Sequence, residues 1–134
     1  MFEYEKIKKL KNKNLTLLLE NIYQKTGTEY YLLVYKIYFH NKFHPIGVIS
    51  YGINVPQNKE HLGNIGYNIK KKYRQRGHAT EACITVLDMI QKNGVKAIII
   101  TCDKNHKATP RICEKLGGIL TKETSKKLFY TILL

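Results

Sequence analysis

The sequence has no tryptophan, only three prolines and only three cysteines among its 134 residues. The cysteines, Cys83, Cys102 and Cys113, lack the CxxC spacing of zinc ligands. An odd number of cysteines cannot all pair within one chain, and this favours reduced thiols. We therefore predict neither a disulfide framework nor a metal site. His40 and His44 flank a short segment and could in principle ligate a metal, but a hairpin turn at Asn41-Lys42 is the favoured interpretation.

Long hydrophobic runs are also missing, so no segment reaches the length that a membrane span needs. The lysines near the N-terminus are followed by neither an apolar segment nor a small-residue cleavage site, so they do not predict a signal peptide. We therefore expect a cytoplasmic protein without membrane contact. With 134 residues, of which 43% are hydrophobic, the chain fits one folded domain over 1–134. The sequence leaves open whether that domain forms a homodimer.

Acidic residues are scarce: 10 Asp and Glu stand against 23 Lys and Arg, which gives a formal net charge of +13. Such a balance raises the alternative of a basic module that binds nucleic acid. Its lysines are spread over most of the chain, however, and the aromatic segment 30–39 is too apolar to be a mostly exposed base-stacking surface. We therefore disfavour nucleic acid as a partner. The three arginines, Arg74, Arg76 and Arg111, are more informative because arginine suits oriented phosphate contacts.

The first half of the chain predicts mainly strands. Segment 14–23 is an apolar run that fits either a strand or a short helix, and a turn follows it. The later segments are rich in aromatic and β-branched residues or alternate in polarity. They predict an antiparallel hairpin of 30–39 and 46–53, a polar loop at 56–63, and a further strand at 64–70.

The second half changes to a helical period. A helix is predicted from Ala79 to a stop at Asn93-Gly94, and the continuously apolar segment 95–102 predicts a strand covered on both faces. Thr109 and Pro110 fit an N-cap and first position of a short helix that ends at Gly117-Gly118. Two closing strands, 117–120 and 128–134, complete an α/β domain with a mixed sheet.

A basic loop joins the strand at 64–70 to the helix. Five Lys or Arg side chains lie between Lys70 and Arg76, next to a helix N-terminus that already carries partial positive charge, so an anion is expected there. Gly77 lets the backbone approach a ligand. Neither GxxxxGK[ST] nor GxGxxG occurs, which disfavours simple nucleotide triphosphate or NAD binding. A plain basic surface turn is the alternative.

The segments GNIGYNIKKKYRQRGHATEA (63–82) and IIITCDKNHKATPRICEKLGG (98–118) resemble the GNAT superfamily of acyl-CoA N-acyltransferases, especially its small bacterial members. The superfamily pattern [RQ]-x-x-G-x-[GA] is matched by RQRGHA at 74–79. The resemblance implies a GNAT-like mixed, mostly antiparallel sheet that is flanked by helices and has a splayed central strand pair. It also implies acetyl-CoA as co-substrate.

The resemblance assigns roles to this chain's own residues. The backbone amides of 75–80 would hold the pyrophosphate, two arginines would add charge, and the end of the preceding strand would offer main-chain hydrogen bonds to the pantetheine arm. The expected cofactor-binding residues are Ile69, Lys70, Arg74, Gln75, Arg76, Gly77, His78, Ala79, Thr80, Asn105 and His106.

Two departures from the family pattern concern the chemistry. His106 stands where many GNAT enzymes carry an asparagine, and Cys113 stands where many carry a tyrosine that protonates the leaving thiolate. Cys113 is thus a candidate acid, although a packing role is the favoured interpretation. Tyr67 is a second candidate donor. For the base, the candidates are Asp103, Glu60 and Glu81.

The sequence therefore predicts an N-acetyltransferase that moves acetyl from acetyl-CoA to an amine of a small molecule or peptide by direct attack in a ternary complex. A GNAT-like domain that senses CoA without turnover is the main alternative.

Overall fold

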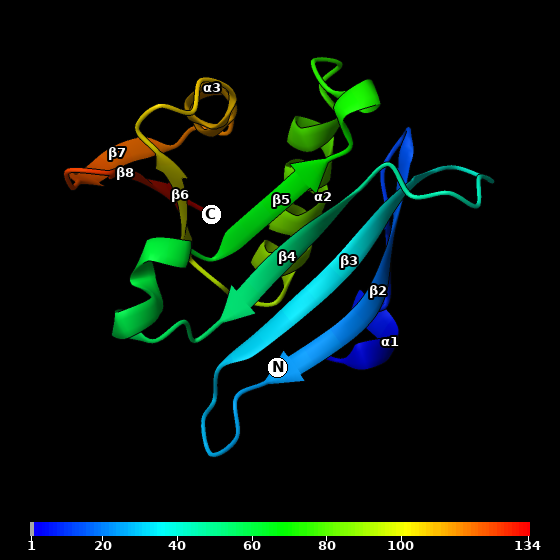
Figure 1. The fold of residues 1–134 in the computed structure, drawn as a ribbon. Helices are drawn as coiled ribbons and strands as arrows, with labels where there is room; N and C mark the ends of the chain where they lie inside the picture. The colour runs from blue at the N-terminus through cyan, green and yellow to red at the C-terminus, as the bar shows by residue number, and fades with distance from the viewer. Residues whose placement is uncertain (1) are drawn as a thin grey trace.

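The structure is a computed structural model that describes residues 2–134, and in it two β-sheets are joined through helices (Figure 1). The larger sheet contains β1 (Lys9–Lys11), β2 (Leu15–Gln24), β3 (Tyr31–Phe39), β4 (Gly47–Ile53) and β5 (Ile65–Ile69). The smaller sheet contains β6 (Ala97–Asp103), β7 (Ile119–Glu123) and β8 (Lys127–Leu133). The helices are α1 (Tyr4–Ile7), α2 (His78–Lys92) and α3 (Ala108–Lys115), with short 3-10 helices η1 (Gln57–Leu62) and η2 (Lys71–Tyr73).

The two sheets differ in topology. The larger sheet has the order β1-β2-β3-β4-β5, and each strand pairs antiparallel with its neighbour in sequence. The smaller sheet has the order β6-β8-β7, so β8 lies between two strands that precede it. β5 and β6 are the splayed pair that the family resemblance implied. The α/β fold of mostly antiparallel strands flanked by helices is therefore confirmed.

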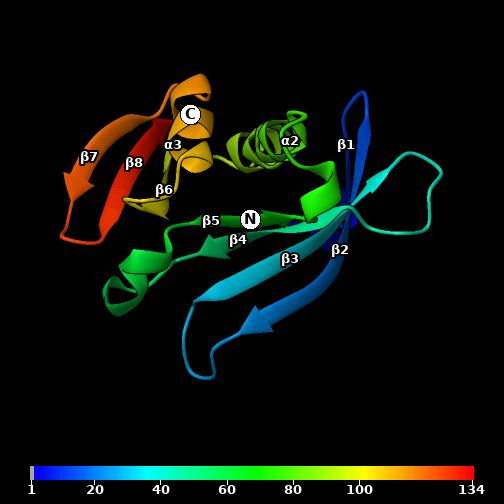
Figure 2. The ribbon, with the colours of Figure 1, turned by 45° about the horizontal axis from the view of Figure 1, so that its top comes forward.

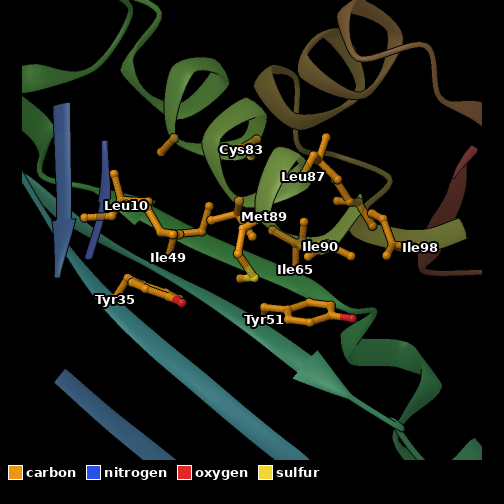
Figure 3. Packing of buried hydrophobic residues seen from close by; sticks show 14 of the residues in the cluster. Leu10, Tyr35, Ile49, Tyr51, Ile65, Cys83, Leu87, Met89, Ile90 and Ile98 are labelled. Carbon is orange, nitrogen blue, oxygen red and sulfur yellow. The ribbon is translucent and has the colours of Figure 1, made fainter. Parts of the chain in front are cut away.

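Helix α2 covers one face of the larger sheet (Figure 2). Its buried side chains follow the predicted helical spacing, and Cys83, Val86 and Ile90 are all 0% exposed. They pack against strand residues of both sheets, among them Ile65 and Ile98 (Figure 3). The core therefore lies between α2 and the splayed strands, and this packing fixes the position of the helix N-terminus.

Several local predictions are resolved by the structure. The ambiguous segment 14–23 forms strand β2, which has a bulge between Leu19 and Asn21, and the polar loop 56–63 contains η1. The prediction that 95–102 is covered on both faces is wrong: burial in β6 alternates, and Ile99 is 38% exposed. The face of β6 that carries Ile99 and Thr101 is partly exposed, and η1 contacts it where Thr101 Oγ1 donates to His61 O at 2.8 Å.

No helix in residues 2–134 is long and apolar enough to cross a membrane. Within the same residues, no group of three or more His, Cys, Asp or Glu side chains could hold a metal ion.

His40 contacts Thr16 Oγ1 through Nδ1 at 2.8 Å and the carbonyl oxygens of Asn12 and Lys13 through Nε2, each at 3.0 Å.

Candidate functional site

The splayed strands β5 and β6 meet at one end, where Asn64 joins them. The Asn64 N–H donates to Ile99 O at 2.7 Å, and Asn64 Oδ1 accepts from the Ile99 N–H at 2.8 Å. On the other side, Asn64 O accepts from the Gly52 N–H at 2.7 Å and Nδ2 donates to Gly52 O at 3.2 Å. Asn64 thus links β4, in the larger sheet, to β6, in the smaller one.

Gly63 allows this close approach. Its φ is +66°, and a Cβ there would lie 2.9 Å from Ile99 O and 3.0 Å from Thr101 N. Both of these atoms are backbone, so they cannot move aside as a flexible side chain could. A side chain at this position would push β6 away from Asn64, and only glycine fits the point where the two strands meet.

Beyond Asn64 the free edge of β5 points toward β6. The Lys70 N–H donates to Ile46 O at 2.8 Å, and the register pairs Gly47 with Ile69. Because backbone groups alternate along an antiparallel ladder, those of Lys70 face β4, whereas those of Tyr67 and Ile69 face away from it. Of the two residues expected to meet the pantetheine arm through their main chain, Ile69 has the required direction and Lys70 has its amide occupied.

The facing edge of β6 follows the same rule. The N–H groups of Leu134 and Lys104 donate to Lys96 O and Lys126 O at 2.8 and 3.0 Å, so the even-numbered residues of β6 pair with β8. The odd-numbered Thr101 and Asp103 therefore turn their backbone groups toward β5. The two strands belong to different sheets and diverge from Asn64 (Figure 1), which leaves two opposed rows of main-chain donors and acceptors.

The loop between η2 and α2 lies beyond the open end of β5. Gly77 is the N-cap of α2 with φ +83°, and a Cβ there would have nothing within 4 Å. Gln75 also has a left-handed φ of +62°, which strains a non-glycine residue. Left-handed residues in such a turn direct successive N–H groups into a concave anion site. Strain at this position is therefore consistent with a functional loop.

Arg74 ties this loop to the end of β5. Its Nε donates to Ile69 O at 2.7 Å, and its Nη2 donates to Asn68 Oδ1 at 3.2 Å. Ile69 O is therefore occupied, and the Ile69 N–H is the group left to face a ligand. Arg76 and Gln75 are exposed beside Gly77. Arg74 and Arg76 thus lie in the loop that leads into Gly77, the N-cap of α2.

The first turn of α2 is fixed by Glu81. Its Oε1 lies 3.0 Å from His78 Nδ1, and its Oε2 accepts from Asn14 Nδ2 at 2.6 Å. The ring of His78 packs edge-on against Phe39, with 5.0 Å between ring centroids. His78, Ala79 and Thr80 are half-buried, so this turn offers its backbone rather than long side chains. The carboxylate of Glu81 is engaged on both oxygens.

The other two candidate bases are also ion-paired. Asp103 lies at the open end of β6, where Oδ1 is 2.9 Å from Lys127 Nζ. The hydrogen bond and charge of Lys127 lower the pKa of Asp103, which weakens it as a base. Glu60, on η1, pairs with Lys122. Asn105 is exposed in the loop after β6.

Tyr67 and α3 meet across the divergence of the two strands. The Tyr67 hydroxyl lies 2.7 Å from Thr109 Oγ1. The prediction that Thr109 is the helix N-cap is wrong: α3 begins at Ala108, with Lys107 as N-cap. The hydroxyl of Thr109 instead pairs with Tyr67, while its N–H donates to His106 Nδ1 at 3.2 Å. His106 therefore holds the first turn of α3.

Cys113 lies one turn further along α3 and is 0% exposed. Burial raises the pKa of its thiol to about 12. The same cause raises the pKa of Cys83, also to about 12. All three cysteines of the chain are buried and free. These surroundings suit a side chain that packs between α3 and α2 more than one that meets a substrate.

Sequence reasoning missed two residues of the site, Asn64 and Thr109. Each makes its contact over a long sequence distance, 35 residues from Asn64 to Ile99 and 42 from Tyr67 to Thr109. The only local signal was their polar character next to apolar segments. Two surface hollows, of about 700 and 570 Å³, lie elsewhere, around β1, and are lined largely by lysines and polar groups.

Comparison with solved structures finds the same fold in acetyltransferases. RimL, a ribosomal α-N-protein acetyltransferase, aligns with a TM-score of 0.72 at 12% identity over 92% of this chain and 92% of its own. An acetyltransferase from Agrobacterium tumefaciens aligns with a TM-score of 0.69 at 14% identity over 98% and 95%. At such identities the likeness shows the fold alone.

The microcin C7 self-immunity acetyltransferase MccE, in complex with acetyl-CoA and AMP, aligns with a TM-score of 0.60 at 18% identity over 77% of this chain. The alignment spans only 61% of that protein's chain. Comparison with curated proteins gives no match. The family model of the acetyltransferase (GNAT) domain, by contrast, matches residues 5–119. The strand, loop and helix described above all lie within that match, and the chain belongs to the GNAT acetyltransferase family.

Proposed function

We propose that this chain is an N-acetyltransferase that moves the acetyl group of acetyl-CoA to an amine of a small molecule or peptide. The observation that carries the proposal is that the Gly77 loop and the free edge of β5 form one continuous surface. The loop around Gly77 lies at the open end of β5, and the outward main-chain groups of Ile69 and Tyr67 continue from it toward Asn64. Pyrophosphate and pantetheine are joined in the same linear order in CoA.

The proposed chemistry is direct attack within a ternary complex. The amine nitrogen attacks the thioester carbonyl carbon, and an N–H on the free edge of β5 stabilises the oxygen on which charge develops. The tetrahedral intermediate collapses with the thiolate as leaving group. Positioning of both substrates supplies much of the rate, because bimolecular encounter is replaced by reaction within the complex. No covalent enzyme intermediate is required.

Thermal unfolding with added ligands tests the cofactor assignment. Acetyl-CoA should raise the melting temperature, whereas AMP and NAD at the same concentration should not, because only CoA matches both the loop and the strand edge. A ligand at 100 times its Kd stabilises by about 2.7 kcal/mol, which is readily measured. Equal shifts with all three ligands would refute the assignment. Mass spectrometry of the purified protein for bound CoA species is an independent check.

A CoA sensor without turnover remains the second candidate, and one observation favours it. The carboxylates of Glu60, Glu81 and Asp103 are all engaged by other side chains, which leaves the base to be supplied by water or by an acceptor that arrives deprotonated. Release of CoA thiol in the presence of a panel of amines separates the two candidates. Thiol release above the amine-free rate supports the enzyme, and tight CoA binding without any release supports the sensor.

A further inference from the structure

We propose that Tyr67 donates the proton that the departing CoA thiolate takes up, and that Thr109 positions the Tyr67 hydroxyl for this step. The inference rests on the acetyltransferase function proposed above and names the acid of that reaction. Tyr67 thus takes the role of acid in place of Cys113, which stands at the position where the family resemblance suggested the acid.

The pair connects the two sides of the divergent strands. Tyr67 belongs to β5 and Thr109 to α3, which packs on β6, and their hydroxyl oxygens lie 2.7 Å apart. Thr109 is only 6% exposed, and its backbone N–H is held by His106 Nδ1. The Thr109 hydroxyl is therefore a fixed partner. Tyr67 is half-buried and packs against the core, so only part of its side chain is exposed.

Tyr67 also lies at the depth that the thioester would reach. A pantetheine arm that enters from the Gly77 loop passes Ile69 first, and Tyr67 is the next residue with backbone groups facing β6. Two residues of strand correspond to about 7 Å. Asn64 closes the path beyond this point by its hydrogen bonds to Ile99. The end of the arm is thereby placed beside Tyr67.

The proposed step balances as follows. The electron pair of the tetrahedral intermediate re-forms the carbonyl, the C–S bond breaks, and the sulfur takes the Tyr67 hydroxyl proton to give CoA thiol. The Thr109 O–H donates to the resulting tyrosinate oxygen, which then regains a proton from water. The attacking amine loses its own proton to water or to the acceptor's surroundings, so one amide and one thiol form and no oxidant is needed.

The Tyr67 hydroxyl holds its proton at neutral pH, as an unperturbed tyrosine also would, and its raised pKa makes it a weaker acid than an unperturbed tyrosine. Burial raises the pKa of Tyr67 to about 12, an effect that the hydrogen bond with Thr109 partly opposes. The hydroxyl therefore carries its proton throughout the neutral range. Cys113, by contrast, is 0% exposed, so its thiol does not reach the surface on which a ligand would bind.

The test compares Tyr67→Phe with Tyr35→Phe, which removes another buried tyrosine hydroxyl. Tyr35 is 0% exposed and donates to Ile7 O at 2.7 Å, and it lies on β3, two strands away from Tyr67 in the larger sheet. Tyr67→Phe should lower kcat about 100-fold, within the range of general acid catalysis, while KM for acetyl-CoA stays within about twofold. Tyr35→Phe should lower stability and leave kcat unchanged.

A binding measurement makes the test independent of the acceptor. CoA and desulfo-CoA differ at the sulfur, so a hydrogen bond from Tyr67 should make the wild type prefer CoA about tenfold. Tyr67→Phe should lose this preference and retain its affinity for desulfo-CoA. Thr109→Val should weaken the preference, and Thr109→Ser, which keeps the hydroxyl, should restore it.

The outcomes separate the two proposals. If the wild type binds neither CoA nor acetyl-CoA, the proposed function fails and the assignment of Tyr67 fails with it. If the wild type binds CoA and Tyr67→Phe discriminates against desulfo-CoA as the wild type does, only the role of Tyr67 is overturned. Loss of discrimination in Tyr67→Phe together with its retention in Tyr35→Phe supports the proposal.

Discussion

Replacement of Asn64 by alanine should both destabilise the protein and lower its affinity for acetyl-CoA. The substitution keeps the backbone bonds to Ile99 O and from Gly52 N, and it removes the side-chain bonds to Ile99 N and Gly52 O. A hydrogen bond contributes about 0.5–1.5 kcal/mol net, and an unpaired buried partner costs more. Ile99 is 38% exposed, so water can reach part of the freed surface.

These terms give a loss of about 2 kcal/mol in the free energy of unfolding. For a domain of this size that corresponds to a fall in melting temperature of roughly 6–10 °C. The two sheets would then be held less firmly at their junction, and the spacing of the opposed backbone rows would be less well defined. We therefore expect the Kd for acetyl-CoA to rise about tenfold, which is about 1.4 kcal/mol.

Asn14→Ala is the matched control, because Asn14 also donates from Nδ2, but to the carboxylate of Glu81 at an exposed site. Its effect should stay within about 0.5 kcal/mol, as for most surface substitutions. Urea unfolding followed by circular dichroism measures the stability, and isothermal titration calorimetry measures the affinity. If Asn64→Ala melts within 2 °C of the wild type, on the order of 0.5 kcal/mol, the assignment of Asn64 as the link between the sheets is wrong.

Two further substitutions test the loop and α3. Gly77→Glu should abolish acetyl-CoA binding, because a carboxylate among the loop amides repels the pyrophosphate. Gly94→Glu is the control and should bind acetyl-CoA normally. Both glycines have a positive φ, +83° and +86°, and open space around a Cβ. Binding by Gly77→Glu in calorimetry would mean that the loop is only a turn. Cys113→Ala should lower the free energy of unfolding by roughly 1 kcal/mol through a small cavity and leave kcat nearly unchanged; a stable variant with kcat reduced about 100-fold would instead identify Cys113 as the acid.

The sequence was informative where periodicity and glycine signals are local. The strand at 64–70, the loop at 74–79 and helix α2 follow from apolar spacing and from Gly77, and all three were predicted close to their observed bounds. By contrast, α1 and β1 were missed, because elements of 4 and 3 residues are too short to show a period.

The contacts that complete the site were beyond sequence reasoning for a different physical reason. Thr109 has the composition of an N-cap, but the tertiary bond to Tyr67 takes its hydroxyl and the helix begins one residue earlier. The exposed face of β6 could not be predicted from the sequence either, because Ile99 on that face is apolar although it is partly exposed. Local propensity cannot report a partner that lies in another strand or helix.

The strand order of the smaller sheet bears on how the domain is made. The larger sheet uses neighbours in sequence throughout, so its five strands can pair as residues up to Ile69 leave the ribosome. β6 can pair only after β8 (residues 127–133) has been synthesised, because β8 lies in the middle of the smaller sheet. One wall of the proposed cofactor site can therefore form early in synthesis, while the other forms only after Leu133 has been added. Until then Ile98 and Ile100, both buried in the finished domain, have no strand partner, and α2 is the element already synthesised that can cover them.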